Sequence, residues 1–454
     1  MNDDARYEQL FAEALADLAP TRAPDWLKTE IKQATSRARP RPRWLAVIKE
    51  PPMRVSSALA VGSPTARVAV ILAATVLMAA AVAGAGIAGS RLLAADGSIV
   101  VDQSGGGDFT TISEAVAAAQ DGDTVLLRPG TYVEAVIVDT DIELKGDGPV
   151  AEIVIMAPED GTTAPIILTE PSSEEDPYAI LLRDTNATLS GLTFEGERSE
   201  VFASGGSPTL EHLRFIGAGF PFDGSSTSAR GSSIVVNNGS TATVRDNTIT
   251  SGGPIGVFDG SEPLIERNTL SGGPHIWGGF GDGAVIRGNI IEGAFVRAIG
   301  SFDASSPLFE GNVISGTGQN AIDIWDGSPT VRSNRIEGTG FIGIFVETTG
   351  QPVIADNELV DNATAISWNA KSGTIEGNTV TGGGAGIVVS TGTPDVRDNS
   401  VASVEERGLV IGFGASPTLS GNTSCDNGEN LLVAEGATPS IDDTNEICED
   451  APLE

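Results

Sequence analysis

The feature that most constrains the fold of this 454-residue chain is an asparagine that returns at nearly constant intervals. It lies in short apolar segments such as VRDNTI, IERNTL and IRGNII, and the successive spacings are 21, 21, 23, 22, 23, 21, 21 and 23 residues. The repeated residues are Asn247, Asn268, Asn289, Asn312, Asn334, Asn357, Asn378, Asn399 and Asn422. A fixed period of this length is typical of a solenoid with one coil per repeat. We therefore predict an all-β parallel β-helix over residues 98–450, and the 56 glycines and 5% aromatic content fit it.

The repeated asparagine is predicted to have a structural role. Neighbouring coils lie about 4.8 Å apart, so equivalent amides stack and can hydrogen-bond along the column. Two earlier coils carry Leu192 and Leu213 at this place. Extra residues at 169–178 and near 220–231 are expected to form loops.

The start of the repeat region, residues 98–149, has its own order of elements. Thr111 and Glu114 form a capping box ahead of a helix with the apolar face Ile112, Ala115 and Val116, which we expect to end at Gly122. Strand-like segments follow. This stretch resembles the opening of pectin-methylesterase-like proteins and, more broadly, right-handed parallel β-helix proteins of the pectin lyase-like superfamily. The resemblance implies a right-handed solenoid whose first helix caps the open end. The Gln, Asp and Arg motifs of pectin methylesterases have no match, so that activity is not expected.

The two cysteines occupy the same place in consecutive periods. Cys425 follows Asn422 by three residues, and Cys448 follows Asn445 by three. Residues on adjacent coils have the Cα separation that a disulfide requires, and an exported domain meets oxidising conditions. We therefore predict a Cys425–Cys448 disulfide at the C-terminal end.

Charge divides the chain into two parts. Residues 1–67 contain 11 Lys/Arg and 8 Asp/Glu, a net charge of +3. The rest of the chain has a net charge of −37, and together they give the total of −34. Residues 68–89 contain no charge and are long enough to cross a bilayer. Basic residues precede this segment, which predicts a single-pass plasma-membrane protein with a cytoplasmic N-terminus and an extracellular β-helix.

The segment before the span is predicted to hold two short amphipathic helices and a basic linker. Its layout resembles that of membrane-anchored anti-sigma factors, which implies a cytoplasmic protein partner for residues 1–35. The alternative is a role in topology and in contact with anionic lipid only.

Aligning the coils separates inward from outward side chains. One inward column runs from Ile255 through Ile322 to Leu409. The outward positions near residues 255–347 are rich in aromatic and acidic residues, which we predict to form an exposed binding face. The candidate substrate-binding residues are Phe258, Asp259, His275, Trp277, Phe302, Trp325, Phe345 and Glu347.

Two classes of function are open on this basis. The favoured one is binding of a polysaccharide or another surface partner, because aromatic faces stack on sugar rings and carboxylates bond hydroxyls. The alternative is a polysaccharide lyase or glycoside hydrolase, in which Asp303, Asp323, Asp326 and Arg297 are the candidate catalytic residues. No cofactor is required by any motif, although the acids could hold Ca²⁺. Nucleic acid is excluded as a partner because the charge of −37 repels phosphate.

Overall fold

The computed structural model describes residues 98–158, 163–164, 176–196, 200–218, 231–273 and 275–450. The predicted cytoplasmic segment 1–67 and the predicted span 68–89 lie outside these residues, as do most of the two expected loops. Within the described residues, no helix has the length and apolar character needed to cross a membrane. The predictions for the anchor and the cytoplasmic segment therefore remain predictions.

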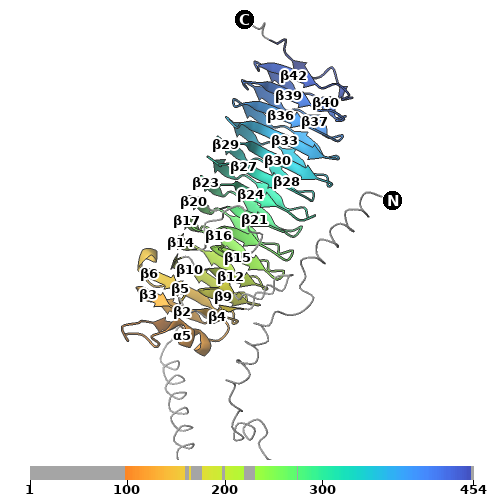
Figure 1. The fold of residues 1–454 in the computed structure, drawn as a ribbon. Coiled ribbons are helices and arrows are strands. Elements are labelled where there is room, and N and C mark those ends of the chain that lie inside the picture. Colours follow the sequence, from red (N-terminus) through yellow and green to blue (C-terminus); the bar gives the residue numbers. More distant parts are fainter. Residues whose placement is uncertain are drawn as a thin grey trace, which may run out of the picture. The chain divides into compact units, whose positions relative to one another are not determined.

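The described residues form a parallel β-helix, as the repeat predicts, in which three long sheets run side by side along the stack of coils (Figure 1). Each complete coil gives one strand to each sheet, and each strand pairs in parallel with its equivalent one coil away. We name the sheets A, B and C.

Sheet A contains fifteen of the described strands, in the order β1 (Ser98–Val101), β2 (Thr124–Leu127), β5 (Glu143–Gly146), β10 (Thr188–Ser190), β13 (Thr209–Glu211), β16 (Thr243–Arg245), β19 (Leu264–Glu266), β22 (Val285–Arg287), β25 (Leu308–Glu310), β28 (Thr330–Arg332), β31 (Val353–Ala355), β34 (Thr374–Glu376), β37 (Asp395–Arg397), β40 (Thr418–Ser420) and β43 (Ser440–Ile441).

Sheet B contains fourteen described strands, in the order β3 (Gly130–Val133), β6 (Ile153–Met156), β11 (Thr193–Glu195), β14 (Arg214–Ile216), β17 (Thr248–Thr250), β20 (Thr269–Ser271), β23 (Ile290–Glu292), β26 (Val313–Ser315), β29 (Arg335–Glu337), β32 (Glu358–Val360), β35 (Thr379–Thr381), β38 (Ser400–Ala402), β41 (Thr423–Cys425) and β44 (Glu446–Ile447).

Sheet C contains thirteen described strands, in the order β4 (Val136–Val138), β9 (Ile180–Arg183), β12 (Val201–Ser204), β15 (Ile234–Asn237), β18 (Ile255–Val257), β21 (Ile276–Gly278), β24 (Arg297–Ser301), β27 (Asn320–Ile324), β30 (Ile342–Thr348), β33 (Thr364–Ala370), β36 (Ala385–Val389), β39 (Arg407–Ile411) and β42 (Glu429–Val433). A short antiparallel pair, β7 (Thr163–Ala164) and β8 (Asp176–Pro177), and the 3-10 helix η1 (Val150–Glu152) stand apart from these sheets.

The core is a set of apolar columns along the inside of the stack. Strands of sheets A and B place their central residue inward, so that Ile265, Ile286 and Phe309 stack in sheet A. The predicted inward column of sheet C, which includes Ile322 and Leu409, is buried in the same core. Each coil thus buries its apolar side chains against its two neighbours, which is the reason a solenoid needs repeats to be stable.

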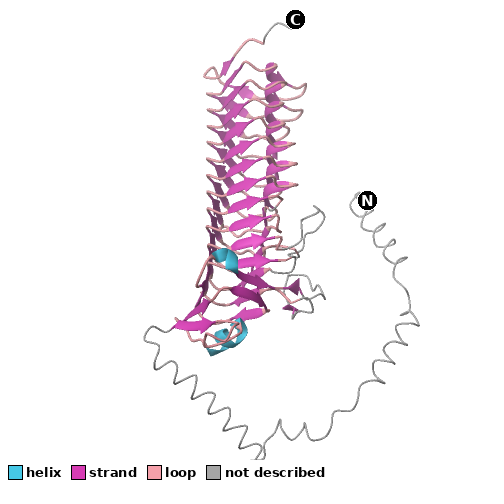
Figure 2. Cartoon of the chain, turned by 90° about the vertical axis from the view of Figure 1, so that its left-hand side faces the viewer, coloured by secondary structure: helices cyan, strands magenta, loops and turns pink. Residues whose placement is uncertain are grey.

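The predicted helix is α5 (Ile112–Ala118), at the end of the stack where the first strands lie (Figure 2). The Thr111 hydroxyl accepts a hydrogen bond from the Glu114 backbone, and the apolar face is buried against β1, β2 and β4. The expected end at Gly122 is wrong, because Ala119 is already extended and the chain turns there toward β2.

The repeated asparagines form one continuous ladder inside the coils, which confirms their predicted structural role. In Asn312, for example, Nδ2 donates to the Ile286 carbonyl at 3.0 Å and to Oδ1 of Asn334 at 2.9 Å. The residue before each of the nine repeated asparagines from Asn247 to Asn422 has a positive φ, as Asp246 and Arg267 show. The amides therefore satisfy the backbone groups that this tight turn would leave unpaired.

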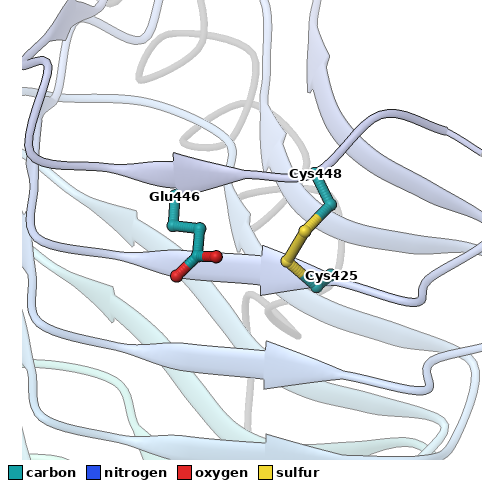
Figure 3. Close-up of side chains that lie close together, drawn as sticks. All are labelled: Cys425, Glu446 and Cys448. Atoms are coloured by element: carbon teal, nitrogen blue, oxygen red, sulfur yellow. A yellow bond between two sulfur atoms is a disulfide. The ribbon is translucent and has the colours of Figure 1, made fainter.

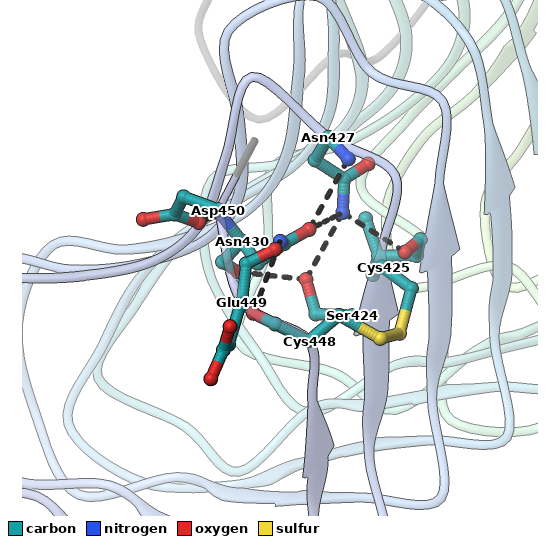
Figure 4. The surroundings of a disulfide bond; sticks show 8 residues. Ser424, Cys425, Asn427, Asn430, Cys448, Glu449 and Asp450 are labelled. Carbon is teal, nitrogen blue, oxygen red and sulfur yellow. Dashed lines mark hydrogen bonds between the residues drawn. A yellow bond between two sulfur atoms is a disulfide. The ribbon is translucent and has the colours of Figure 1, made fainter. Parts of the chain in front are cut away.

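The last coils are joined by the predicted disulfide, which is present between Cys425 and Cys448 with a Cα–Cα distance of 5.0 Å. Beside it, Nδ2 of Asn430 donates to the Cys448 carbonyl, and the Ser424 hydroxyl donates to the Asn430 carbonyl (Figure 4). The backbone N–H of Asn430 donates to Asp450. Covalent and polar contacts thus replace the next coil that this end lacks within the described residues.

Candidate functional site

The predicted outward residues lie on the outer face of sheet C, where the strand register places them in rows. One row runs from coil to coil as Gly256, Trp277, Gly300, Asp323 and Phe345. Two residues further along each coil, at the end of or just beyond the strand, a second row follows: Phe258, Gly279, Phe302, Trp325 and Glu347. The predicted candidates from Phe258 to Glu347 are therefore neighbours on one face.

Trp277 is the centre of an aromatic cluster on this face. Phe258 and Phe302 lie edge-on to its ring, with centroid distances of 5.4 and 5.8 Å. A Cβ at Gly256 would meet the Phe258 ring at 2.7 Å, and one at Gly300 would meet Phe302 at 3.3 Å. The two glycines therefore provide the floor on which both phenylalanine rings rest.

This packing corrects the prediction of a uniformly exposed aromatic wall. Trp277 is only 5% exposed, and His275, whose ring centroid lies 6.4 Å from it, is 2% exposed. Both residues are on the outer face, but neighbouring side chains cover them. Trp277 and His275 therefore pack beneath the exposed side chains of this face. Direct contact of either residue with a ligand remains a prediction.

His275 is held in the neutral state by this environment. Burial, together with the positive charge of Arg297, lowers its pKa from 6.5 to about 3. A neutral imidazole beside Trp277 adds no charge to the face near pH 7.

Asp323 is the most connected polar residue of the face. Its carboxylate lies 3.1 Å from Nε of Arg297 and accepts a hydrogen bond of 2.6 Å from Nδ2 of Asn320. Trp325, two residues further along the chain, is its third polar neighbour. These three partners lower the pKa of Asp323, but burial acts more strongly and the pKa is raised overall.

Arg297 connects the carboxylate to the aromatic cluster. Its guanidinium carbon lies 5.0 Å from the centroid of the Phe302 ring, while its Nε faces Asp323. The side chain is 15% exposed. Arg297 therefore stabilises the site by a cation–π contact and an ion pair at once.

The exposed part of the site is formed by Trp325 and Phe345. Trp325 is 45% exposed, and its ring centroid lies 5.3 Å from that of Phe345 on the next coil. Phe345 packs against the indole on one side, and much of the remaining indole surface is open to solvent. This arrangement provides a rigid aromatic platform beside a polar centre.

The other predicted acids have different environments. Asp326 stabilises its own turn. Its Oδ1 accepts hydrogen bonds from the Gly327 backbone N–H at 2.8 Å and from the Thr348 hydroxyl at 3.3 Å. Asp303 and Glu347 are exposed at the edge of the face. Asp259 lies in a turn with a φ of 55°. The structure thus gives the predicted catalytic acid Asp326 a structural role in its turn, and its part in catalysis stays a prediction.

Sequence reasoning missed Asn320 and the two glycines. Asn320 lies at the start of β27 and orients Asp323, but a single asparagine outside the main ladder gives no signal in one sequence. Gly256 and Gly300 alternate with Trp277 along the outward row, and this alternation could have indicated that the rings fold back over the sheet.

One group of three metal-binding residue types is present in the described part of the chain, at Cys425, Glu446 and Cys448 (Figure 3). Both sulfur atoms are joined in the disulfide, so neither can act as a thiolate ligand. This group is therefore a structural crosslink beside an acid, and Ca²⁺ binding elsewhere stays a prediction.

A family model described as "Right handed beta helix region" matches residues 178–359 and 342–446. A search of curated proteins finds no match. Among solved structures, the periplasmic alginate epimerase AlgG is 15% identical, with 68% of this chain and 85% of that chain covered and a TM-score of 0.50. The catalytic domain of a GH87 alpha-1,3-glucanase in complex with nigerose is 11% identical, with 77% and 69% covered and a TM-score of 0.47. The GH87 catalytic unit from Streptomyces thermodiastaticus strain HF3-3 is 14% identical, with 78% and 70% covered and a TM-score of 0.45. These distant similarities to carbohydrate-active β-helix enzymes concern the fold.

Proposed function

Because the chain belongs to the family of right-handed beta helix regions, we propose that its outer face binds an extended ligand, and that this ligand is a polysaccharide. The observation that carries the proposal is the Trp325–Phe345 platform, which lies beside the buried carboxylate of Asp323. A sugar ring offers C–H groups that pack on an aromatic face and hydroxyls that bond to carboxylates. A long solenoid face presents such contacts in line, one coil after another.

The geometry favours binding over chemistry at Asp323. A carboxylate that already contacts Arg297, Asn320 and Trp325 has the surroundings of a positioning residue.

A second candidate function, a glycoside hydrolase or polysaccharide lyase, rests on a different observation. Burial raises the pKa of Asp323, and a general acid in glycoside hydrolysis must keep its proton in this way. Protonated Asp323 would donate to the glycosidic oxygen, with the exposed Asp303 as the second carboxyl. In the lyase alternative, Arg297 would be the base, but its ion pair with Asp323 opposes that role.

The test is calorimetric titration of the purified protein with a panel of neutral, acidic and basic polysaccharides. We expect Trp325→Ala to weaken binding by about tenfold or more, as loss of a buried aromatic contact does. Phe413→Ala is the matched control, because Phe413 is 79% exposed on a different coil. Equal effects of the two substitutions would reject the platform.

The same samples decide between binding and catalysis. New reducing ends or unsaturated products that disappear in Asp323→Asn would establish the enzyme. Binding without any product would establish the binding protein.

The location of the chain is part of the proposal. The charge change at residue 67 supports an anchor at residues 68–89, with residues 1–35 contacting a cytoplasmic partner and the β-helix outside the cell. Protease added to intact cells should degrade the β-helix and leave the N-terminal segment protected. The reverse pattern would reject this orientation.

A further inference from the structure

We infer that the polysaccharide bound at Trp325 carries free amino groups. The inference rests on the proposed function and adds the chemical class of the ligand, which the surface charge decides. Three features of the face carry it: acids without ion pairs, an arginine already neutralised, and the position of Glu347 beside the platform.

Two acids beside the platform, Asp303 and Glu347, differ from the paired glutamates of sheet A. On the outer face of sheet A, glutamates pair with arginines from neighbouring coils, as in Glu211–Arg245, Glu310–Arg332 and Glu376–Arg397. Within the described residues, Asp303 and Glu347 are in no ion pair. Asp303 and Glu347 thus keep their charge beside the aromatic platform.

The strands that carry the platform hold little positive charge, since β21, β24, β27 and β30 contain one basic residue, Arg297. Arg297 is the basic residue of the site, and Asp323 and the Phe302 ring already occupy its guanidinium. His275 is neutral near pH 7, because burial lowers its pKa to about 3. A uronate or sulfate would therefore meet Asp303 and Glu347 without a compensating charge, which disfavours its binding.

Glu347 lies where an ammonium group on a stacked sugar would reach it. It is two residues beyond Phe345 on β30, and both side chains are on the outer face. Glu347 also lies one coil beyond Trp325 at the same edge of the sheet. This follows from the register, because Ile324, which precedes Trp325, pairs with Val346, which precedes Glu347. Coils are about 4.8 Å apart, so a sugar on the indole lies within ion-pairing distance of the carboxylate.

The experiment compares hexamers of glucosamine, N-acetylglucosamine and galacturonate by calorimetry, using the full chain. We expect glucosamine to bind best, N-acetylglucosamine about tenfold more weakly, and galacturonate without detectable heat. The double variant Asp303→Asn/Glu347→Gln should reduce the affinity for the glucosamine hexamer to that for the N-acetylglucosamine hexamer. Its affinity for the N-acetylglucosamine hexamer should differ from that of the wild type by less than about twofold.

The matched control removes the same charge elsewhere. Glu405 and Glu406 are exposed on a distant coil, so Glu405→Gln/Glu406→Gln should leave glucosamine binding unchanged. An equal loss in this control would show general attraction to an acidic surface and overturn the inference. Galacturonate binding as tight as glucosamine binding would also overturn it.

These outcomes are distinct from failure of the proposed function. If galacturonate binds best and Trp325→Ala abolishes that binding, the polysaccharide site stands and the amino-sugar assignment falls. If none of the hexamers binds and Trp325→Ala changes nothing with any polysaccharide, the proposed function itself falls.

Discussion

The side chains of Arg297 and Asp323 meet on the outer face of the β-helix, with Nε of the arginine 3.1 Å from Oδ2 of the aspartate. Asp323 is 3% exposed, so this ion pair is largely removed from water. Breaking one partner of a buried pair leaves the other charge uncompensated, which is more costly than losing a surface pair. The pair therefore makes the site sensitive both to pH and to substitution.

The first prediction concerns the titration of Asp323. Its pKa is raised above the ordinary 3.8, because burial outweighs the three partners of the carboxylate. The stability that protonated Asp323 contributes is fully present below the pKa of this carboxyl in the unfolded chain. It is lost as pH rises through the pKa of the carboxyl in the folded protein. The melting temperature of the wild type relative to Asp323→Asn should therefore fall as pH increases from about 4. A difference that instead grows with pH would show that Arg297 outweighs burial.

The second prediction concerns His275 and runs in the opposite direction. Its pKa is lowered from 6.5 to about 3, so its stability contribution is complete above pH 6.5 and is lost as pH falls toward 3. We expect His275→Gln to reduce the acid sensitivity of unfolding, measured by urea titration at several pH values. His212 is exposed, and His212→Asn should leave that sensitivity unchanged. Equal effects of the two substitutions would contradict the prediction.

The third prediction concerns the asparagine ladder. Asn312→Ala removes bonds to Ile286 and Asn334 and leaves the backbone N–H of Asn289 without its acceptor. The expected loss is about 3 kcal/mol in the free energy of unfolding, since buried donors and acceptors are left unpaired. Asn445→Ala, in the part-buried last rung, should lose about 1 kcal/mol. Equal losses would show that burial does not set the strength of the ladder.

The fourth prediction concerns the floor of the aromatic cluster. A Cβ at Gly300 would lie 2.7 Å from Cδ of Arg297 and 3.3 Å from the Phe302 ring. Gly300→Val should displace both side chains and reduce stability by about 1–3 kcal/mol through overpacking. Gly300→Ala should have a smaller effect in the same direction. The measurement is chemical unfolding together with polysaccharide binding, and an unaffected Gly300→Val would disprove the role of this glycine.

The fifth prediction concerns the disulfide. It closes a loop of 23 residues, for which loop-closure entropy gives about 3 kcal/mol. Because each coil contacts only its neighbours, Cys425→Ser/Cys448→Ser should accelerate amide hydrogen exchange in the last coils and leave the coils near Asn312 unchanged. Uniform acceleration along the whole β-helix would contradict this local effect.

The sequence alone determined the β-helix, because its period acts at every coil. The stacking of Asn312 on Asn334 and the pairing of Cys425 with Cys448 follow from spacings of 22 and 23 residues. The same register correctly placed Trp277 and Asp323 on the outer face, since side chains alternate along a strand.

Only the tertiary structure decided which outward side chains are open to a ligand. Trp277 and Trp325 both lie on the outer face of sheet C, yet one is 5% exposed and the other 45%. Among the described residues, Phe258 and Phe302 pack edge-on against Trp277 from the two adjacent coils, whereas Trp325 has one aromatic neighbour, Phe345. Periodicity fixes the direction in which a residue leaves the backbone, but its burial depends on the rotamers of neighbours on adjacent coils.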